Sequence, residues 1–110
     1  SSKDSGSMSP LLREKVRSAR DVQRERFSKK GNLITQNSEM SARDLVNFIV
    51  LDKEPRQTLD MASNRLGFSP RVYHRMLKVA RTIADIEGSE NILNAHILEA
   101  VEYRPKKFDV

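Results

Sequence analysis

The sequence predicts an all-α fold, a bundle of about five helices in one domain. Apolar residues recur at helical spacing in five segments, and residues suited to capping a helix precede these segments. No segment shows sustained two-residue alternation, and the Asn-Gly or Asp-Gly pairs typical of β-hairpins are absent. A chain of 110 residues is long enough for one core. We therefore expect a helical domain over residues 11–105.

The two ends of the chain have a different composition from this domain. Residues 1–10 begin with a run of small polar side chains, which offer too little apolar surface to offset the entropy lost on ordering. They are interpreted as a disordered linker or as residues left by cloning. Residues 106–110 are expected to form a loose tail.

The first predicted helix starts at the cap Ser9 and at Pro10, and it ends near Gly31. Its narrow apolar stripe consists of Leu12, Val16, Ala19, Gln23 and Phe27. Residues 31–40 are expected to form a loop that Leu33 and Ile34 attach to the core. Ser41 then caps a short helix that is predicted to reach Leu51.

Three further helices follow. Asp52 caps a helix with Pro55 in its first turn, and Gly67 ends it. Ser69 and Pro70 open the best-defined helix, which runs to Gly88 with about half of its circumference apolar, so we expect it at the centre of the bundle. The last helix starts at the cap Asn94 and ends before Pro105. Its inward residues are predicted to be Ile97, Leu98, Val101 and Tyr103.

The positive charge of the chain is concentrated in the first helical segment. Residues 9–30 contain eight Lys or Arg against three acidic residues, whereas residues 31–110 contain eleven of each sign. Four arginines follow helical spacing on one line: Arg13, Arg17, Arg20 and Arg24. This line is either a solvated helix face or a contact surface for DNA or a neighbouring subunit, and an electrostatic partner should meet it first.

Several kinds of chemistry are not supported by the sequence. There is no phosphate-binding Gly-x-x-x-x-Gly-Lys-Ser/Thr motif, so we expect no catalytic residue and no enzymatic activity from this chain alone. There is no cysteine, and His74 and His96 are far apart, so no metal site is predicted. Asp85 and Glu87 cannot face each other on a helix, and a helix-surface role is expected for both. Without a membrane-spanning segment or a secretory signal, the expected location is the cytoplasm.

One long pattern of residues resembles a known family. It consists of residues 67–88, GFSPRVYHRMLKVARTIADIEG, followed by Ile92, His96, Leu98, Glu99, Ala100 and Tyr103-Arg104-Pro105. Arg13, Val16, Ala19-Arg20 and Gln23 extend it to the first helix. Over about residues 11–105 the chain resembles the C-terminal lid domain of magnesium-chelatase subunit I-like AAA+ ATPases, and within that family the competence-protein type is the nearest.

The resemblance implies that this chain is the lid of an ATPase whose nucleotide-binding core, with its phosphate loop and magnesium ligands, lies upstream. ATP and magnesium would then be cofactors of the full-length protein only. The Ser-Pro-Arg motif would place the sensor 2 arginine at Arg71, which reaches the γ-phosphate of ATP. Partners would be the upstream core, neighbouring subunits of a ring and DNA, with DNA processing favoured over metal insertion into a porphyrin.

Other interpretations stand beside this one. Arg71 could be an ordinary surface arginine, although a guanidinium at the second position of a capped helix is well placed to hold an anion. Arg75, Lys78 and Arg81 continue along the polar face of the same helix and either are solvated or contact phosphate or a neighbouring subunit. The main alternative function is a stand-alone basic helical DNA-binding module, and a third is a purely structural protein-interaction bundle.

Overall fold

The fold is all-α, as the sequence predicts. The computed structural model describes residues 9–28 and 33–104, and this part of the chain contains five α-helices, one 3₁₀ turn and no strand. The elements are α2 (Pro10–Ser28), η1 (Asn37–Glu39), α3 (Ala42–Phe48), α4 (Lys53–Leu66), α5 (Pro70–Ile86) and α6 (Asn94–Glu102).

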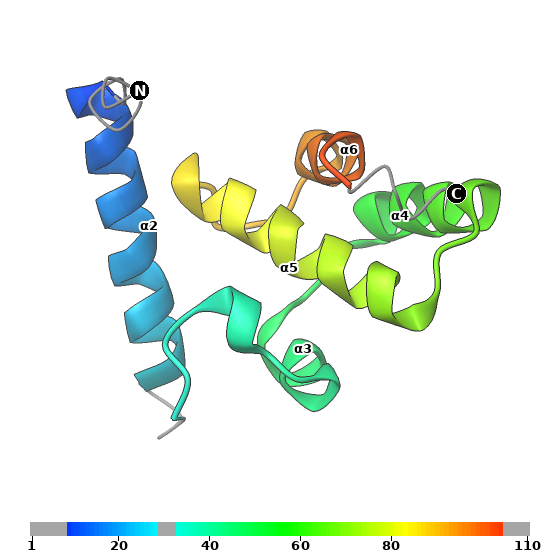
Figure 1. Ribbon diagram of the computed structural model, residues 1–110, viewed down its shortest axis with the longest axis horizontal. Helices are drawn as coiled ribbons and strands as arrows, with labels where there is room; N and C mark the ends of the chain where they lie inside the picture. The colour runs from blue at the N-terminus through cyan, green and yellow to red at the C-terminus, as the bar shows by residue number, and fades with distance from the viewer. Residues whose placement is uncertain (1–8, 29–32, 105–110) are drawn as a thin grey trace, which may run out of the picture.

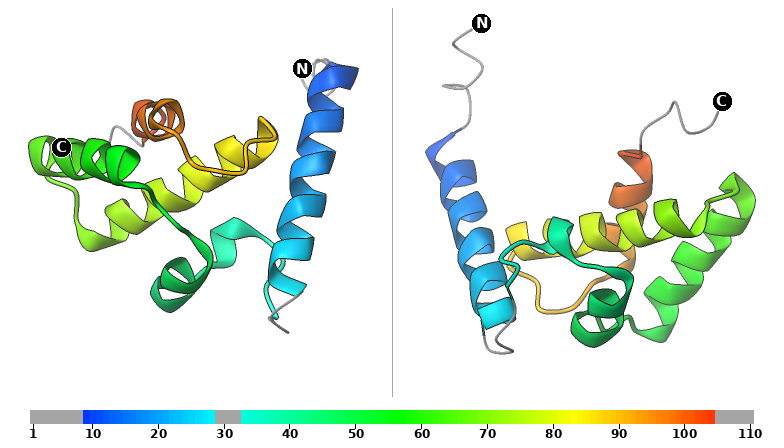
Figure 2. Two further views of the ribbon diagram at one scale, coloured as in Figure 1. Left: turned by 180° about the vertical axis from the view of Figure 1, so that it is seen from behind. Right: turned by 60° about the horizontal axis from the view of Figure 1, so that its bottom comes forward.

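Helix α5 runs across the middle of the molecule, and the other elements are arranged around it (Figure 1). It packs against α2, η1, α3 and α6, and α6 packs in turn against α4. Helix α2 stands at one edge, steeply inclined to α5, in both the front view and the tilted view (Figure 2). The predicted central position of α5 is therefore confirmed.

The main core lies where α5 and α6 meet α4. Met76, Ala80 and Ala84 supply the α5 side of it, and small residues there let the helices approach closely. Ile97 and Ala100 come from α6, and the remaining buried members are Leu51, Leu59 and Ile92. Tyr73 adds a polar link, because its hydroxyl donates to Asp60 Oδ1 of α4 at 2.7 Å. Burial, reinforced by this hydrogen bond, raises the pKa of Tyr73 to about 12.

A second cluster attaches the lower end of α2 to η1 and α3. Phe27, Met40 and Leu45 are buried in it, and the Phe27 ring meets Phe48 edge to face with centroids 4.9 Å apart. Leu77 of α5 packs against both clusters. This central helix thus joins the two parts of the core.

The predicted helix signals around α5 form as expected. Gly67 ends α4 with φ of +70°, and the N–H groups of Gly67 and Phe68 both donate to the Ser63 carbonyl. Ser69 caps α5 by accepting a hydrogen bond from Val72 N–H at 3.2 Å. Gly88, with φ of +73°, lies just beyond the C-terminal end of α5. Ser9 likewise caps α2 through Leu12 N–H at 3.0 Å.

Some expectations about individual elements were wrong. The helix that starts after Ser41 ends at Phe48 and does not reach Leu51, which lies buried in an extended connection. Asn94 is the first residue of α6 and not its cap, because the N-cap position is taken by Leu93, whose N–H donates to Nδ1 of His96 in the first turn at 2.9 Å. Asn94 Oδ1 instead accepts the Thr58 hydroxyl of α4 at 2.9 Å.

Three apolar side chains expected in the core lie outside it. The exposed fractions are 98% for Leu33, 58% for Leu98 and 70% for Tyr103. The buried face of α6 follows Ile97, Ala100 and the half-buried Val101, so Leu98 is turned about 100° away from it. The next residue of this loop, Ile34, packs against the second core cluster.

The predicted linker lies only partly within the described residues. Ser9 and Pro10, assigned to the linker of residues 1–10, cap and open α2, whereas the rest of that linker and the expected tail at 106–110 lie outside the described residues. In the described helices, no stretch is both long and apolar enough to cross a membrane.

Two adjacent residues of α6 provide a matched test of which face of this helix packs into the main core. Ile97→Ala should lower the free energy of unfolding by about 2 to 5 kcal/mol, because Ile97 is 1% exposed and truncation leaves a cavity. Leu98→Ala should change it by less than about 0.5 kcal/mol. Urea denaturation of both variants measures the difference, and equal losses would show that the α6 face is wrongly assigned.

Candidate functional site

Arg71 lies at the start of α5, in the position that its sequence context predicts. Ser69 caps the helix, Pro70 is its first residue and Arg71 its second. The Arg71 side chain is exposed, and among the described residues it has no hydrogen-bond or ion-pair partner. A guanidinium beside the positive end of a helix dipole therefore remains available for an anion.

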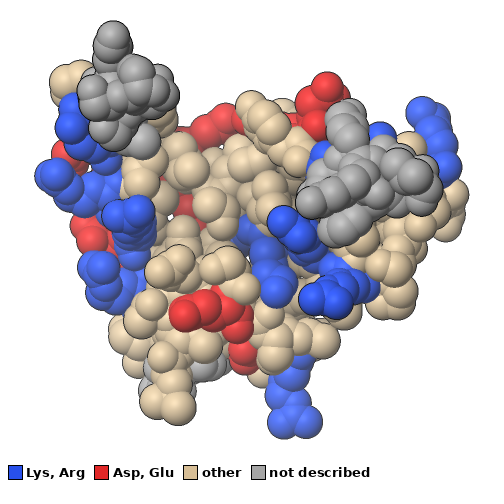
Figure 3. Space-filling model, viewed as in Figure 1, with Lys and Arg blue, Asp and Glu red and all other residues tan. Residues whose placement is uncertain are grey.

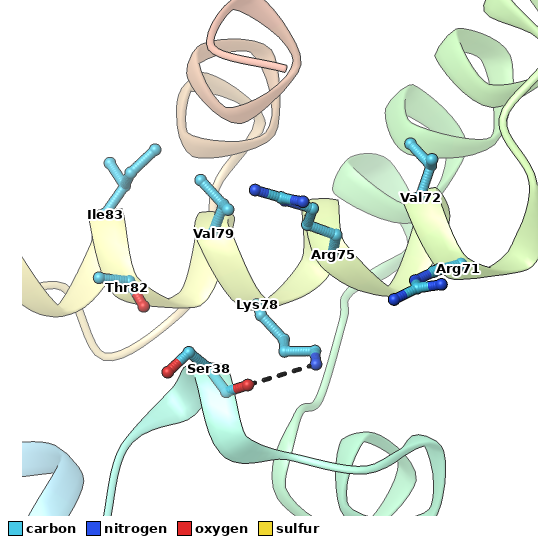
Figure 4. Close-up of a pocket in the computed structure, with 8 residues that line it drawn as sticks. All are labelled: Ser38, Arg71, Val72, Arg75, Lys78, Val79, Thr82 and Ile83. Atoms are coloured by element: carbon cyan, nitrogen blue, oxygen red, sulfur yellow. Dashed lines mark hydrogen bonds between the residues drawn. The ribbon is translucent and has the colours of Figure 1, made fainter. Parts of the chain in front are cut away.

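Arg71 forms one end of a groove along the front of α5, which we call the α5 groove. Its volume is about 510 Å³, and it is lined by Ser38, Arg71, Val72, Arg75, Lys78, Val79, Thr82 and Ile83. Figure 4 shows Val72, Val79 and Ile83 on one side of the helix, while Lys78 reaches down to the Ser38 carbonyl, with Nζ to O at 3.5 Å. Arg75 lies between them, and its guanidinium extends towards Val79.

This lining suits a ligand with both an anionic and an apolar part. Three cationic side chains can hold phosphate or carboxylate oxygens, and the valine and isoleucine side chains offer apolar surface beside them. The volume lies within the usual range of about 300 to 1,000 Å³ for small-molecule sites. Ile83 is half-buried in this groove, whereas Met76 of the same helix is fully buried in the main core.

The helical spacing predicts Arg81 on the exposed polar face with Arg75 and Lys78. This prediction was wrong. The Arg81 side chain is 8% exposed, and its guanidinium donates to the carbonyl oxygens of Ser89 at 2.8 Å and Glu90 at 3.0 Å. Burial lowers the pKa of Arg81, and the neighbouring carboxylate of Asp85 opposes that shift. Arg81 therefore stabilises the turn after α5.

Asp85 also departs from its expected place on the helix surface. Its side chain is 1% exposed, and both carboxylate oxygens accept from Arg26 of α2, at 2.7 and 2.9 Å. Arg81 approaches the same carboxylate at 3.1 Å, and the Asn37 amide of η1 donates to it at 2.8 Å. Because a buried charge needs such partners, this carboxylate ties three elements together. We call these four residues the Asp85 network.

Further hydrogen bonds extend the Asp85 network. Asn37 N–H donates to Gln23 Oε1 of α2 at 2.8 Å, and the Asn37 side chain accepts from Arg26 at 2.8 Å and donates to Thr82 at 3.1 Å. Gln23, placed in the apolar stripe of α2 by its spacing, is thus buried because it bonds to a backbone group. The polar contacts fix both the position and the rotation of α2.

The sequence analysis did not predict a structural role for Asp85 or for its partners Arg26 and Asn37. One available signal was the spacing of Arg81 and Asp85, which is the i,i+4 distance of a helical ion pair. The links to Arg26 and Asn37 span 59 and 48 residues, and no local pattern predicts them.

The arginines of α2 form a separate basic surface, which we call the α2 face. Two of them pair with acids one turn away, Arg17 with Glu14 at 3.4 Å and Arg24 with Asp21 at 3.2 Å, and both pairs are exposed. A shallow groove of about 380 Å³ is lined by Arg13, Val16, Arg17, Arg20, Asp21 and Arg24. Figure 3 shows basic side chains along α2, at the left edge of the molecule, and over α5 near its centre.

The two histidines have different surroundings. His74 is half-buried on α5, whereas His96 is buried, with Nε2 2.8 Å from Glu87 Oε1. Because His96 Nδ1 accepts the Leu93 N–H, the ring proton of a neutral imidazole lies on Nε2. Within residues 9–28 and 33–104 there is no group of three His, Asp or Glu side chains that could hold a metal ion.

Comparison with known proteins gives the family. The model of the family described as "Magnesium chelatase, subunit ChlI C-terminal" matches residues 6–104. The chain belongs to this family. No solved structure gives a significant match.

Curated relatives give the type within the ChlI C-terminal family. Competence protein ComM of Haemophilus influenzae is 39% identical over 101 residues, which cover 92% of this chain and 19% of ComM. The YifB proteins of Escherichia coli and Salmonella typhimurium are 36% and 35% identical over 99 residues, 90% of this chain and 18% of each relative. The chain thus spans about a fifth of the length of these relatives.

Asp85→Asn tests whether the network determines the position of α2. The change keeps the shape of the side chain but removes its charge and leaves two guanidinium groups without their shared anion, so we expect a loss of about 3 to 5 kcal/mol in the free energy of unfolding. Hydrogen exchange should show that the backbone amides of α2 exchange faster in this variant than in the wild type, and that those of α6 are less affected. Asp21→Asn, in an exposed pair, is the control and should cost less than about 1 kcal/mol. Similar stability of the two variants would contradict this role.

Proposed function

We propose that this chain is the C-terminal lid of a ring-forming AAA+ ATPase of the ComM type, and that Arg71 senses the γ-phosphate of ATP bound by the core of the same protein. Membership of the ChlI C-terminal family supports the placement as a C-terminal domain. The observation that carries the sensor role is the exposed Arg71 at the start of the Ser69-capped helix, at the end of the α5 groove.

The proposed role of Arg71 follows from its chemistry. The planar guanidinium can make two parallel hydrogen bonds to a phosphate, and the N-terminal end of α5 adds a favourable dipole. A contact to the γ-phosphate exists with ATP and not with ADP, so it favours the closed lid in only one nucleotide state. Arg75 and Lys78 lie further along the groove as candidate phosphate or subunit contacts.

The core of the longer ATPase would supply the parts that this chain does not contain. Its phosphate loop and acidic residues would bind ATP and magnesium, and hydrolysis would take place there. The lid would then act as a regulatory element and not as an enzyme by itself. The chain covers 19% of ComM, which is compatible with a core in the remaining part of such a protein.

We propose that α5 couples the nucleotide to the ring. Arg71 is at one end of α5, and Asp85, near the other end, binds Arg26 of α2. If Arg71 moves α5 when it binds the nucleotide, this ion pair would make α2 move with α5. Helix α2 precedes the rest of the lid in the chain, so it would turn relative to the core and to neighbouring subunits. We propose DNA processing in the cytoplasm as the process served, as the family resemblance implies; a competence protein is among the relatives.

In the full-length ATPase, Arg71→Ala should lower ATP turnover by about tenfold or more, because a charge-assisted hydrogen bond contributes about 1.5 to 3 kcal/mol. Arg71→Lys should restore little, since an ammonium group lacks the planar fork. Steady-state ATPase assays and nucleotide-dependent sedimentation measure turnover and ring assembly.

Arg56→Ala provides the matched control, because Arg56 is an exposed arginine on α4 that does not line the α5 groove. Its turnover should equal that of the wild type. Thermal melting should show that every variant remains folded. Wild-type turnover and assembly in Arg71→Ala would refute the sensor role.

A further inference from the structure

The α5 groove and the groove on the α2 face are connected by a third hollow. This cleft of about 280 Å³ lies between α2 and the end of α5. It shares Ser38 and Thr82 with the α5 groove, and Val16 and Arg20 with the α2 groove. The three hollows therefore adjoin one another, and we call them together the basic track.

Basic side chains occur along the whole basic track. They are Arg71, Arg75 and Lys78 over α5, Arg20 at the junction, and Arg13, Arg17 and Arg24 on α2. The nearby acids are already engaged. Glu14 and Asp21 pair with arginines of the track, and the Glu39 carboxylate accepts the N–H groups of Thr35 and Gln36 at 2.9 and 3.1 Å, which lowers the pKa of Glu39.

The shape of the basic track limits what can occupy it. The track follows α5 and then turns onto α2, which is steeply inclined to α5 (Figure 1). The molecule measures 38 Å along each of its two longer axes, so the bend must occur within a short distance. A double helix resists such bending, since its persistence length is about 150 base pairs, whereas a single strand turns freely at each nucleotide. An extended anion that bends easily fits best.

We propose that the basic track binds single-stranded nucleic acid, with the backbone phosphates on its arginines and lysine and with bases against Val72, Val79 and Ile83. Phosphate contacts carry no sequence information, so binding is independent of sequence. Aromatic side chains, the usual stacking platforms, do not line the three hollows, which makes the ionic contribution dominant and the affinity strongly salt-dependent. This binding does not need ATP, and it goes beyond the proposed role of Arg71 as a nucleotide sensor.

The test uses this 110-residue chain and a fluorescent oligothymidine of about 15 nucleotides, a length typical of single-strand sites. Fluorescence anisotropy at a series of salt concentrations gives the slope of log K against log salt. Arg17→Gln with Arg20→Gln removes two charges from the α2 face, and Arg75→Gln with Lys78→Gln removes two from the α5 groove. Each pair should reduce the slope by about 1.4, at about 0.7 per phosphate contact.

Matched controls separate a defined track from general charge attraction. Arg43→Gln with Arg56→Gln removes the same charge from exposed positions on α3 and α4 that line none of the three hollows, and it should leave the slope unchanged. Arg17→Lys with Arg20→Lys keeps the charge and should also keep the slope. Circular dichroism melts check that each variant is folded.

The outcomes are distinct. Loss of slope in both track pairs, with the controls unchanged, supports the proposal. An equal loss in the Arg43 and Arg56 pair, an effect of only one track pair, equal or tighter binding of a duplex of the same length, or no binding at low salt would each overturn it. Since the assay contains no ATP and leaves Arg71 intact, its failure would not bear on the sensor role, and failure of the sensor role would leave strand binding in place.

Discussion

A single buried carboxylate determines how the two halves of this domain are joined. Asp85 is held between the guanidinium groups of Arg26 and Arg81 and the amide of Asn37, so one charge connects α2, η1 and α5. Apart from this network, α2 buries only a narrow stripe. The buried apolar residues of this stripe are Ala19 and Phe27. Removal of an anion from between two cations costs more than loss of an exposed ion pair, because the remaining charges stay desolvated. The orientation of the α2 face relative to the α5 groove depends on this interaction.

In the proposed lid function, the same network would make α5 a mechanical link. Arg71 and Asp85 are fourteen positions apart on one helix, which corresponds to roughly 21 Å at 1.5 Å per residue. A ligand that holds Arg71 acts on one end of a rigid element, and the ion pair with Arg26 is near the other end. Leu77 in the middle packs against both core clusters, so the helix is expected to move with its surroundings and not independently of them.

The sequence was sufficient for the parts of the structure that depend on local signals. Ser69, Pro70 and Gly67 mark the ends of helices through backbone chemistry that operates within a few residues, and the apolar stripes of α5 correctly placed it at the centre. Leu98 and Tyr103 were assigned to the core because apolar character does not state which face of a short helix is covered. Arg81 and Asp85 were assigned to the surface because charged residues are mostly exposed. Only the tertiary fold brings Arg26 and Asn37 to them, and these long-range partners make burial of the charges favourable.

The central claim is that Arg71 contacts the γ-phosphate, and a structure of the full-length ATPase with a non-hydrolysable ATP analogue tests it most directly. The account predicts that the Arg71 guanidinium lies within hydrogen-bond distance, about 2.7 to 3.2 Å, of a γ-phosphate oxygen, in its own subunit or in the neighbouring one. It also predicts that Asp85 remains bound to Arg26 in that state. A bound triphosphate with Arg71 directed into solvent, and with no residue of this domain at the γ-phosphate, would contradict the account.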